Sequence, residues 1–188
     1  MFALFNRFKR RIYIEGKHEE WGVFTRQGRS ITSNFKGNFV YTVLLQENTR
    51  LENGDLFEVK LDGGWTKFLV VSVRRSEESV QAVVYRCNGI AEILRPVEEY
   101  DDNDNLKGTR LELIARVPVN HMIINDYMRM IDPGLLPSVT KEFRMQKCDV
   151  RLLDRLVVDG DKFVVDAVDN TKFDGLLAVQ TSVDNRKL

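Results

Sequence analysis

Histidine and cysteine are the side chains best suited to catalysis or metal binding, and the chain has two of each. His18 and His121 are not spaced as a metal-binding pair, and neither has Cys87 or Cys148 as a sequence neighbour. No nucleophile elbow and no phosphate-binding glycine loop accompanies them. The sequence therefore predicts no catalytic, cofactor-binding or metal-ligating residues, although a Ser-His-Asp or Cys-His site assembled by folding stays open.

An acidic segment at residues 98–108 partly matches the ligand spacing of a calcium-binding loop. Counting from Asp101, asparagines fall at the third and fifth places and Glu112 at the twelfth. The sixth place, which needs glycine for a sharp turn, is Leu106. Glu112 also lies within an apparent strand, whereas the last ligand of such a loop begins a helix. We therefore expect an exposed acidic loop that does not bind calcium.

Aromatic and basic residues are the other candidates for a binding role. Phenylalanine recurs every three residues at the start of the chain, and four basic residues cluster around the third. We expect residues 2–11 to form a short helix or arm that docks on its own fold or on a neighbour. Trp21 and Trp65 lie beside glycine in apparent turns and could anchor an interface or fill a core. The candidate interface residues are Phe2, Phe5, Phe8, Arg7, Lys9, Arg10, Arg11, Trp21 and Trp65.

The length and composition describe a folded chain of one domain or two small ones. It has 188 residues, of which 43% are hydrophobic, so a sizeable core is available. No stretch approaches the roughly 20 apolar residues of a membrane-spanning helix. At the N-terminus the apolar residues precede the basic ones, which is the reverse of a secretory signal. These patterns indicate a cytoplasmic protein that does not enter a membrane.

Charge is balanced in total but unevenly distributed. The 28 basic and 28 acidic residues give residues 1–50 a net charge of +5, residues 51–110 a charge of −4 and residues 111–188 a charge of −1. A basic first quarter and more acidic later segments suit head-to-tail packing between copies, although simple solvation of both remains an alternative. The balanced total argues against a dedicated nucleic-acid-binding protein.

The hydrophobic pattern is mainly that of short β-strands between glycine-containing turns. We expect small β-barrel or β-sandwich modules and divide the chain into four segments. These are an N-terminal arm with strands (1–50), a first β module (51–97), an acidic loop and connection (98–140) and a second β module (141–188). Residues 121–131 could be helical and end at the following Asp-Pro-Gly.

The two β modules share an order of elements that suggests an internal repeat. Each has a strand, an Asp-Gly turn, a strand that begins with phenylalanine, a polar loop and a third strand. From Phe68 to Val73 and from Phe163 to Val168 the spacing is five residues in both modules. Such a meander needs a partner, so the units either cover each other or each close a barrel with further strands. Two unrelated hairpins with common turns are the alternative.

This pattern resembles the head-completion, stopper and neck proteins that connect head and tail in tailed phages. Residues 154–184 carry the better match, with Asp159-Gly160-Asp161-Lys162-Phe163 at its centre and Leu153 where a leading glycine is expected. Residues 54–88 match more loosely. The resemblance implies a β-barrel or β-sandwich subunit of a ring below the portal, and it carries over no catalytic residue.

The resulting functional hypothesis is a non-enzymatic structural protein of the virion, assembled in the host cytoplasm. It would form a homo-oligomeric ring, bind portal and tail proteins, and contact packaged DNA if it helps to retain it. The alternative is a small barrel that binds single-stranded nucleic acid, with arginines 74, 75 and 86 near its aromatic residues. Neither hypothesis requires a cofactor.

Overall fold

A computed structural model describes residues 8–17, 19–26, 40–61, 63–77 and 79–187. These residues form twelve strands and one short helix, so the protein is mainly β, as the sequence predicts. The described part contains no helix of the length and apolarity that crossing a membrane requires. The elements are β1 (Lys9–Ile14), β2 (Glu19–Arg26), β3 (Val40–Leu45), β4 (Leu56–Leu61), β5 (Gly64–Arg75), β6 (Val80–Arg86), β7 (Gly89–Tyr100), β8 (Leu106–Ile123), α1 (Asp126–Ile131), β9 (Lys141–Gln146), β10 (Arg155–Val158), β11 (Asp161–Asp169) and β12 (Leu176–Val183).

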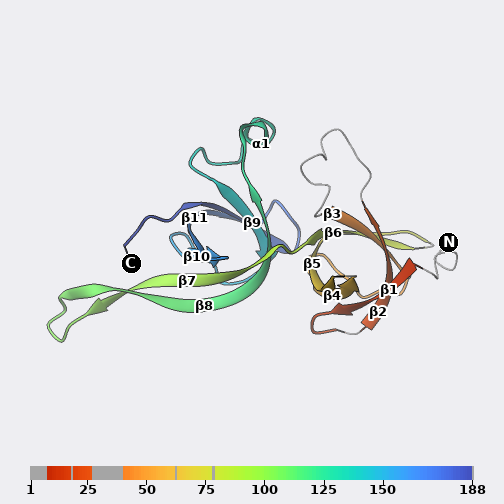
Figure 1. Ribbon diagram of the computed structural model, residues 1–188, viewed down its shortest axis with the longest axis horizontal. Coiled ribbons are helices and arrows are strands. Elements are labelled where there is room, and N and C mark those ends of the chain that lie inside the picture. Colours follow the sequence, from red (N-terminus) through yellow and green to blue (C-terminus); the bar gives the residue numbers. More distant parts are fainter. Residues whose placement is uncertain (1–7, 18, 27–39, 62, 78, 188) are drawn as a thin grey trace. The chain divides into compact units, whose positions relative to one another are not determined.

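The strands form two closed antiparallel barrels of six strands each (Figure 1). Around the first barrel the order is β1-β2-β3-β6-β5-β4, and around the second it is β7-β8-β9-β12-β11-β10. Each strand of the second barrel therefore takes the place of the strand six positions earlier in the first. The expected internal repeat is present and extends beyond the predicted meanders to the whole barrel.

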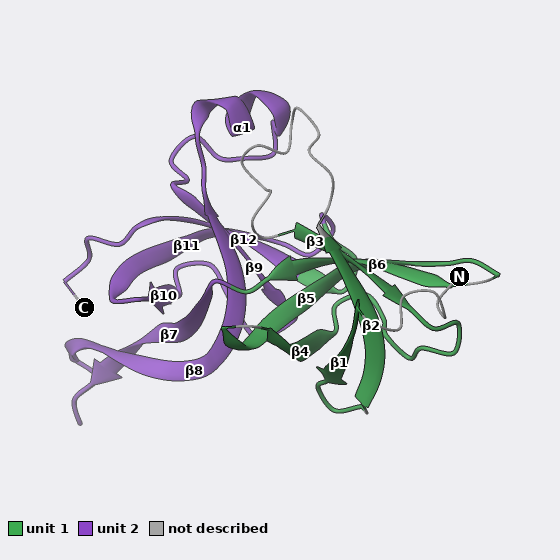
Figure 2. Cartoon of the chain, turned by 45° about the vertical axis from the view of Figure 1, so that its right-hand side comes forward, with its two compact units in different colours: residues 1–87, 173–176 green, residues 88–172, 177–188 purple. Residues whose placement is uncertain are grey.

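The chain divides into two compact units that each contain one barrel (Figure 2). The first unit comprises residues 1–87 together with 173–176, and the second comprises residues 88–172 together with 177–188. Strands from the expected segments 1–50 and 51–97 close the first barrel. Strands from 51–97, 98–140 and 141–188 close the second, so the predicted β modules are meanders that other strands complete.

The backbone hydrogen bonds that precede the fourth strand are the same in both barrels, and we call this segment the corner. In the first barrel the Gly54 N–H donates to the Val70 carbonyl at 2.9 Å, and the Val70 N–H donates to the Asp55 carbonyl at 2.9 Å. In the ladder between β5 and β6 the register shifts between Val70 and Ser72, as it does at a β-bulge. In the second barrel Leu153 donates to Val165 at 3.0 Å, Val165 donates to Asp154 at 2.9 Å, and the register shift follows Val165.

The residue that leads this corner adopts a left-handed backbone in both copies. Gly54 has φ +85° and Leu153 has φ +67°. Glycine tolerates this region, whereas a side chain costs about 1–2 kcal/mol there. Leu153 stands where the sequence pattern expects glycine, but it adopts the same backbone conformation as Gly54, so the corner is unchanged.

The turn signals read from the sequence are also confirmed. Asp159 and Gly160 have φ +52° and +88°, the pair of positive angles that a two-residue type I′ hairpin turn needs. They join β10 to β11, whose ladder pairs Val158 with Asp161. In the first barrel Leu61 pairs with Gly64 at the corresponding hairpin.

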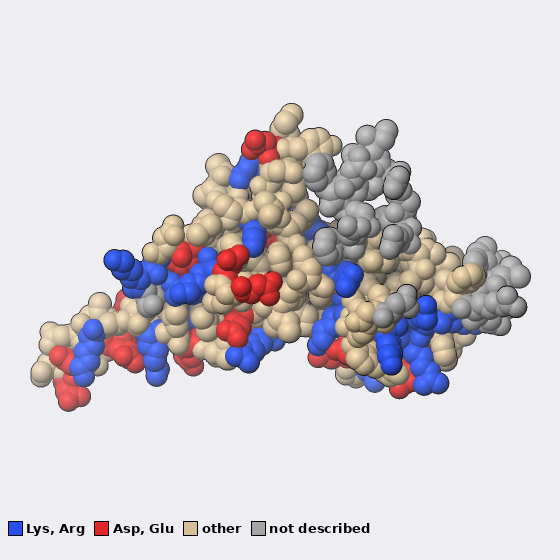
Figure 3. Space-filling view, in the orientation of Figure 1, with Lys and Arg blue, Asp and Glu red and all other residues tan. Residues whose placement is uncertain are grey.

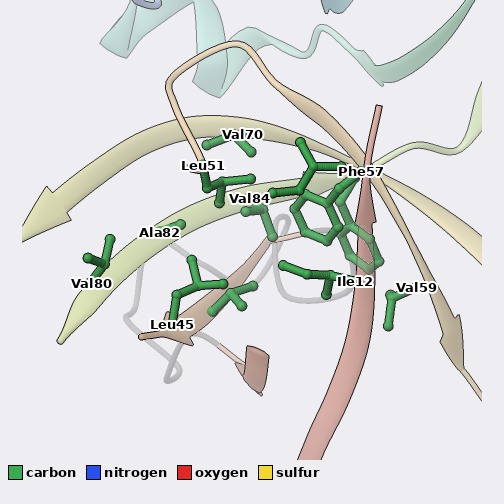
Figure 4. Packing of buried hydrophobic residues seen from close by; sticks show 12 residues of the cluster. Ile12, Leu45, Leu51, Phe57, Val59, Val70, Val80, Ala82 and Val84 are labelled. Carbon is green, nitrogen blue, oxygen red and sulfur yellow. The ribbon is translucent and has the colours of Figure 1, made fainter. Parts of the chain in front are cut away.

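Each barrel has its own hydrophobic core. In the first, Phe57 and Phe68 stack at 5.4 Å between ring centres, surrounded by aliphatic side chains from the other strands (Figure 4). In the second, Phe163 is 4% exposed and packs on Phe143 at 5.5 Å. The inward-facing residues alternate with outward-facing ones, as a barrel wall requires.

The expected N-terminal helix or arm is wrong for the part of residues 2–11 that the structure describes. Lys9–Ile14 is strand β1, which pairs with β2 and with β4 and so closes the barrel. Ile12 and Ile14 are buried on the inward face, which accounts for the strand. Phe2, Phe5 and Arg7 lie outside the described residues.

Two further expectations in the middle of the chain are corrected. Residues 98–108 are mostly strand, because β7 and β8 continue as a hairpin whose turn occupies only residues 101–105. The helix predicted at 121–131 is confined to Asp126–Ile131, where Asn125 caps it by accepting from the Met128 N–H. Residues 121–123 belong to β8 and pair with β9.

Candidate interaction surface

The outer wall of the first barrel carries a hollow of about 670 Å³. Strands β1, β2, β4 and β5 form its walls. Its lining combines aromatic rings with basic side chains, and Lys and Arg gather around β1 and β2 in Figure 3. The lining residues are Lys9, Arg10, Arg11, Tyr13, Trp21, Lys60, Leu61 and Trp65.

Strand alternation explains why most of these side chains point outward, although Arg10 shares the parity of the inward positions and Leu61 packs partly against the core. On β1 the inward positions are Ile12 and Ile14, so Arg11 and Tyr13 lie on the opposite face. Arg11 pairs with Trp21 across the β1–β2 ladder. Closure of the barrel by β1 and β4 then brings the β4–β5 hairpin, with Trp65, to the other side of Tyr13.

The aromatic side chains form two contacts at the hollow. The rings of Tyr13 and Trp65 meet edge to face with their centres 5.0 Å apart. The Arg11 guanidinium carbon lies 5.2 Å from the centre of the Trp21 ring, within the range of a cation–π contact. Trp21 is 44% exposed and Trp65 57%, so neither fills the core, which was the alternative reading of both. These rings are available to a partner.

The electrostatic character of the hollow is positive. Among the described residues that line it, four carry a positive charge and none a carboxylate. Nearby carboxylates are engaged at the border, where Glu19 lies 3.8 Å from Arg11 and Glu58 lies 3.1 Å from Lys67. Exposed ion pairs of this kind are weak, so the surface suits an acidic partner with an apolar part.

The structure brings together most of the described interface candidates. Lys9, Arg10, Arg11, Trp21 and Trp65 all line the hollow, although they come from three strands. Phe8 is described and 66% exposed, but it does not line the hollow. Three members were missed by the sequence analysis: Tyr13, Lys60 and Leu61. The outward parity of Tyr13 opposite Ile12 and Ile14 was a signal for it, whereas Lys60 and Leu61 required knowledge of the β1–β4 pairing.

A second surface feature is the hairpin formed by the ends of β7 and β8, which runs on past the barrel as a two-stranded ribbon (Figure 1). The ladders attach β7 to β10 through Glu92–Leu94 and β8 to β9 through residues 120–123. Within the described residues, the backbones of Pro96–Tyr100 and Leu106–Glu112 pair only with each other. The ribbon therefore has two open edges.

The tip of this hairpin is acidic, carries one exposed apolar pair, and has a turn held by its own hydrogen bonds. Residues 98–107 contain five acidic side chains and one basic one, and acidic side chains mark the end of the ribbon in Figure 3. Tyr100 and Leu106 pair across the ladder and are 54% and 59% exposed. The Asp101 carboxylate accepts the N–H groups of Asn103 and Asn105 at 2.8 and 2.9 Å. These hydrogen bonds, those from Asn105 most of all, hold the pKa of Asp101 below its ordinary value.

The histidines and cysteines are not assembled into a site in the part of the chain that is described. His18 lies outside it. His121 packs on Phe143 at 5.4 Å, and burial, followed by the charge of Lys141, lowers its pKa. Burial raises the pKa of Cys87 to about 12 and also raises that of Cys148. Across the described residues no group of three or more His, Cys, Asp or Glu side chains could hold a metal ion.

The arginines that suggested nucleic-acid binding lie on the neighbouring strands β5 and β6. Arg75 donates to the carbonyls of Thr49 and Leu51 at 3.1 and 3.2 Å, which ties it to the preceding loop. Arg74 pairs with Gln81, and Arg86 with Phe68, on the β5–β6 ladder. None of the three lines the hollow.

Comparison with known proteins does not assign the chain to a family. No family model matches the chain, and no curated protein matches it. Among solved structures, the K. pneumonia MrkH–c-di-GMP complex aligns with 98% of this chain and 85% of that chain, at 10% sequence identity and a TM-score of 0.29. A likeness at that level supports no inference about function.

Proposed function

We propose that the protein is a structural subunit of a tailed-phage connector, joining the portal of the head to the tail as part of a homo-oligomeric ring. Its place is the virion, after assembly in the host cytoplasm. Its work is binding, and no catalytic residue or cofactor is assigned to it. The resemblance of residues 154–184 to connector modules motivates this proposal.

The β7–β8 hairpin is the observation that carries the proposal. A ribbon with two open edges and exposed Tyr100, Leu106 and Leu113 has little to stabilise it in isolation. Such ribbons gain stability when another chain covers their apolar side chains or extends their edges. A subunit of an assembly supplies such a chain.

Electron microscopy of the purified protein, alone and mixed with purified portal, tests this function. We expect closed rings, or added density on one face of the portal. Particles of protomer size in both samples, with the portal unchanged, would overturn the proposal.

Single-stranded nucleic acid remains a second candidate ligand because the hollow itself favours it. Bases stack on exposed aromatic rings, and arginine and lysine neutralise the backbone phosphates. Tyr13, Trp21 and Trp65 with Arg11 supply both. A fluorescent oligothymidine should then bind at low salt and dissociate steeply as salt rises. Absence of binding at low salt removes this candidate.

A further inference from the structure

We infer that the acidic tip of the β7–β8 hairpin of one copy docks into the aromatic, basic hollow on the first barrel of a second copy. This inference rests on the proposed ring and specifies the contact that builds it. The tip is defined as residues 98–107, and the hollow by the eight residues that line it.

Charge complementarity is the first support. The tip has five carboxylates against Lys107, and the hollow has four cations against no lining carboxylate. Glu99 is paired with Arg110 at 3.3 Å, and Glu98 accepts from the Tyr100 hydroxyl. The Asp101 carboxylate accepts from its own turn, whereas Asp102 and Asp104 are exposed at the tip. Opposite charges on two patches of one chain favour head-to-tail contacts, which close into rings when the rotation permits.

The apolar groups match as well. The exposed pair Tyr100 and Leu106 lies among the tip carboxylates, and Trp21 and Trp65 lie among the cations of the hollow. Docking would bury apolar groups on both sides at the centre and leave charges at the rim, the usual anatomy of a protein interface.

The tip is also prepared for binding. The Asp101 N–H donates to the Asn105 carbonyl at 2.9 Å, and the Asp101 side chain accepts two backbone N–H groups of the same turn. Asp104 adopts the left-handed backbone, φ +60°, that aspartate tolerates better than most residues. A turn fixed in this way loses little conformational entropy on docking.

Two charge-reversed variants test the contact. The tip variant carries Glu98→Lys, Glu99→Lys and Asp102→Lys, and the hollow variant carries Lys9→Glu, Arg11→Glu and Lys60→Glu, so that basic residues outnumber acidic ones at the tip and acidic residues outnumber basic ones in the hollow. Each places like charges on both surfaces, so self-association of either alone should weaken by about a hundredfold. An equimolar mixture should assemble again, because each tip then meets a hollow of opposite charge. Restoration on mixing requires contact between different molecules.

Matched controls carry the same charge changes away from both surfaces. One control carries Glu47→Lys, Glu77→Lys and Asp161→Lys, and the other carries Lys147→Glu, Lys162→Glu and Lys187→Glu. All six residues are exposed and have no role in the contact. Sedimentation velocity and circular dichroism of all samples compare assembly and folding. The controls should assemble as the wild type does.

The outcomes separate the two proposals. If the wild type assembles and both reversed variants assemble equally well, the docking contact is wrong while the ring stands. If the variants fail alone and the mixture does not recover, the contact is also wrong. If the hollow variant loses oligothymidine binding while assembly is unchanged, the hollow takes nucleic acid. If the wild type neither assembles nor binds portal, the proposed function falls together with the contact.

Discussion

Replacing Asp184 with asparagine should destabilise the second barrel strongly. The Asp184 carboxylate is fully buried and accepts from Arg155 Nε at 2.7 Å and from Arg186 at 2.7 Å. The Arg155 side chain is only 2% exposed, so its charge has little access to water. Asparagine keeps the shape of the side chain and removes its charge. The buried Arg155 guanidinium then has no counter-charge, although its Nη2 still donates to the Arg186 carbonyl at 2.9 Å.

The magnitude follows from the burial of both partners. Breaking a buried ion pair by removing one charge costs about 3–5 kcal/mol, because the remaining charge stays desolvated. A domain has about 5–15 kcal/mol of stability in total, so this is a large share. For a unit of this size we expect the melting temperature to fall by more than about 10 °C.

The pH dependence gives a second signature. Arg186 first, and Arg155 with it, hold the pKa of Asp184 well below its usual range, whereas the unfolded chain has the ordinary value of about 3.9. The stability that Asp184 contributes is therefore present above about pH 4 and is lost as the pH falls toward the lower, folded pKa. The difference between the wild type and the Asp184→Asn variant should be constant near neutrality and shrink below about pH 4.

Urea unfolding of both proteins between neutral and acid pH measures this difference. Asp161→Asn is the matched control. The Asp161 side chain is 72% exposed and lies 3.7 Å from Lys141, which makes a weak surface ion pair. Removing its charge should change the free energy of unfolding by less than about 0.5 kcal/mol. Equal stability of the two variants at neutral pH, or a difference that does not shrink on acidification, would refute the reasoning.

Three other predictions follow from the fold. Phe163→Ala should cost about 3–5 kcal/mol in a thermal melt, because the ring is 4% exposed against Phe143, and an unchanged melt would contradict its packing. Leu153→Gly should raise the stability by up to about 1 kcal/mol, since it relieves a positive φ and loses a side chain that is 63% exposed; a lower stability in urea would argue against strain there. Calorimetry with millimolar calcium should show no saturable heat, because the Asp101 carboxylate already accepts two N–H groups of its turn; saturable binding would overturn this reading of the tip.

The sequence predicted the parts of the fold that depend on local chemistry. Asp159-Gly160 makes its turn because aspartate and glycine accept positive φ, and the equal spacing after Phe68 and Phe163 marks equivalent strands. The closure of each barrel could not be predicted. It depends on the pairing of β1 with β4 and of β7 with β10, which join strands far apart in the chain through backbone groups common to all residues.

The two surface features were predicted to different degrees. Exposed tryptophans and clustered basic residues identified much of the hollow, but Lys60 reaches it only through the barrel closure. The sequence predicts a loop at residues 98–108 because they lack the apolar alternation of a strand with one buried face. A ribbon with both faces exposed has no such face, so its sequence carries no signal of that kind.

Sedimentation velocity of the wild-type protein over a range of concentrations, with and without purified portal, tests the proposed assembly most directly. We predict a transition from protomer to one defined larger species as concentration rises, and cosedimentation with portal. A single species of protomer mass at every concentration, with portal sedimenting alone, would contradict the account.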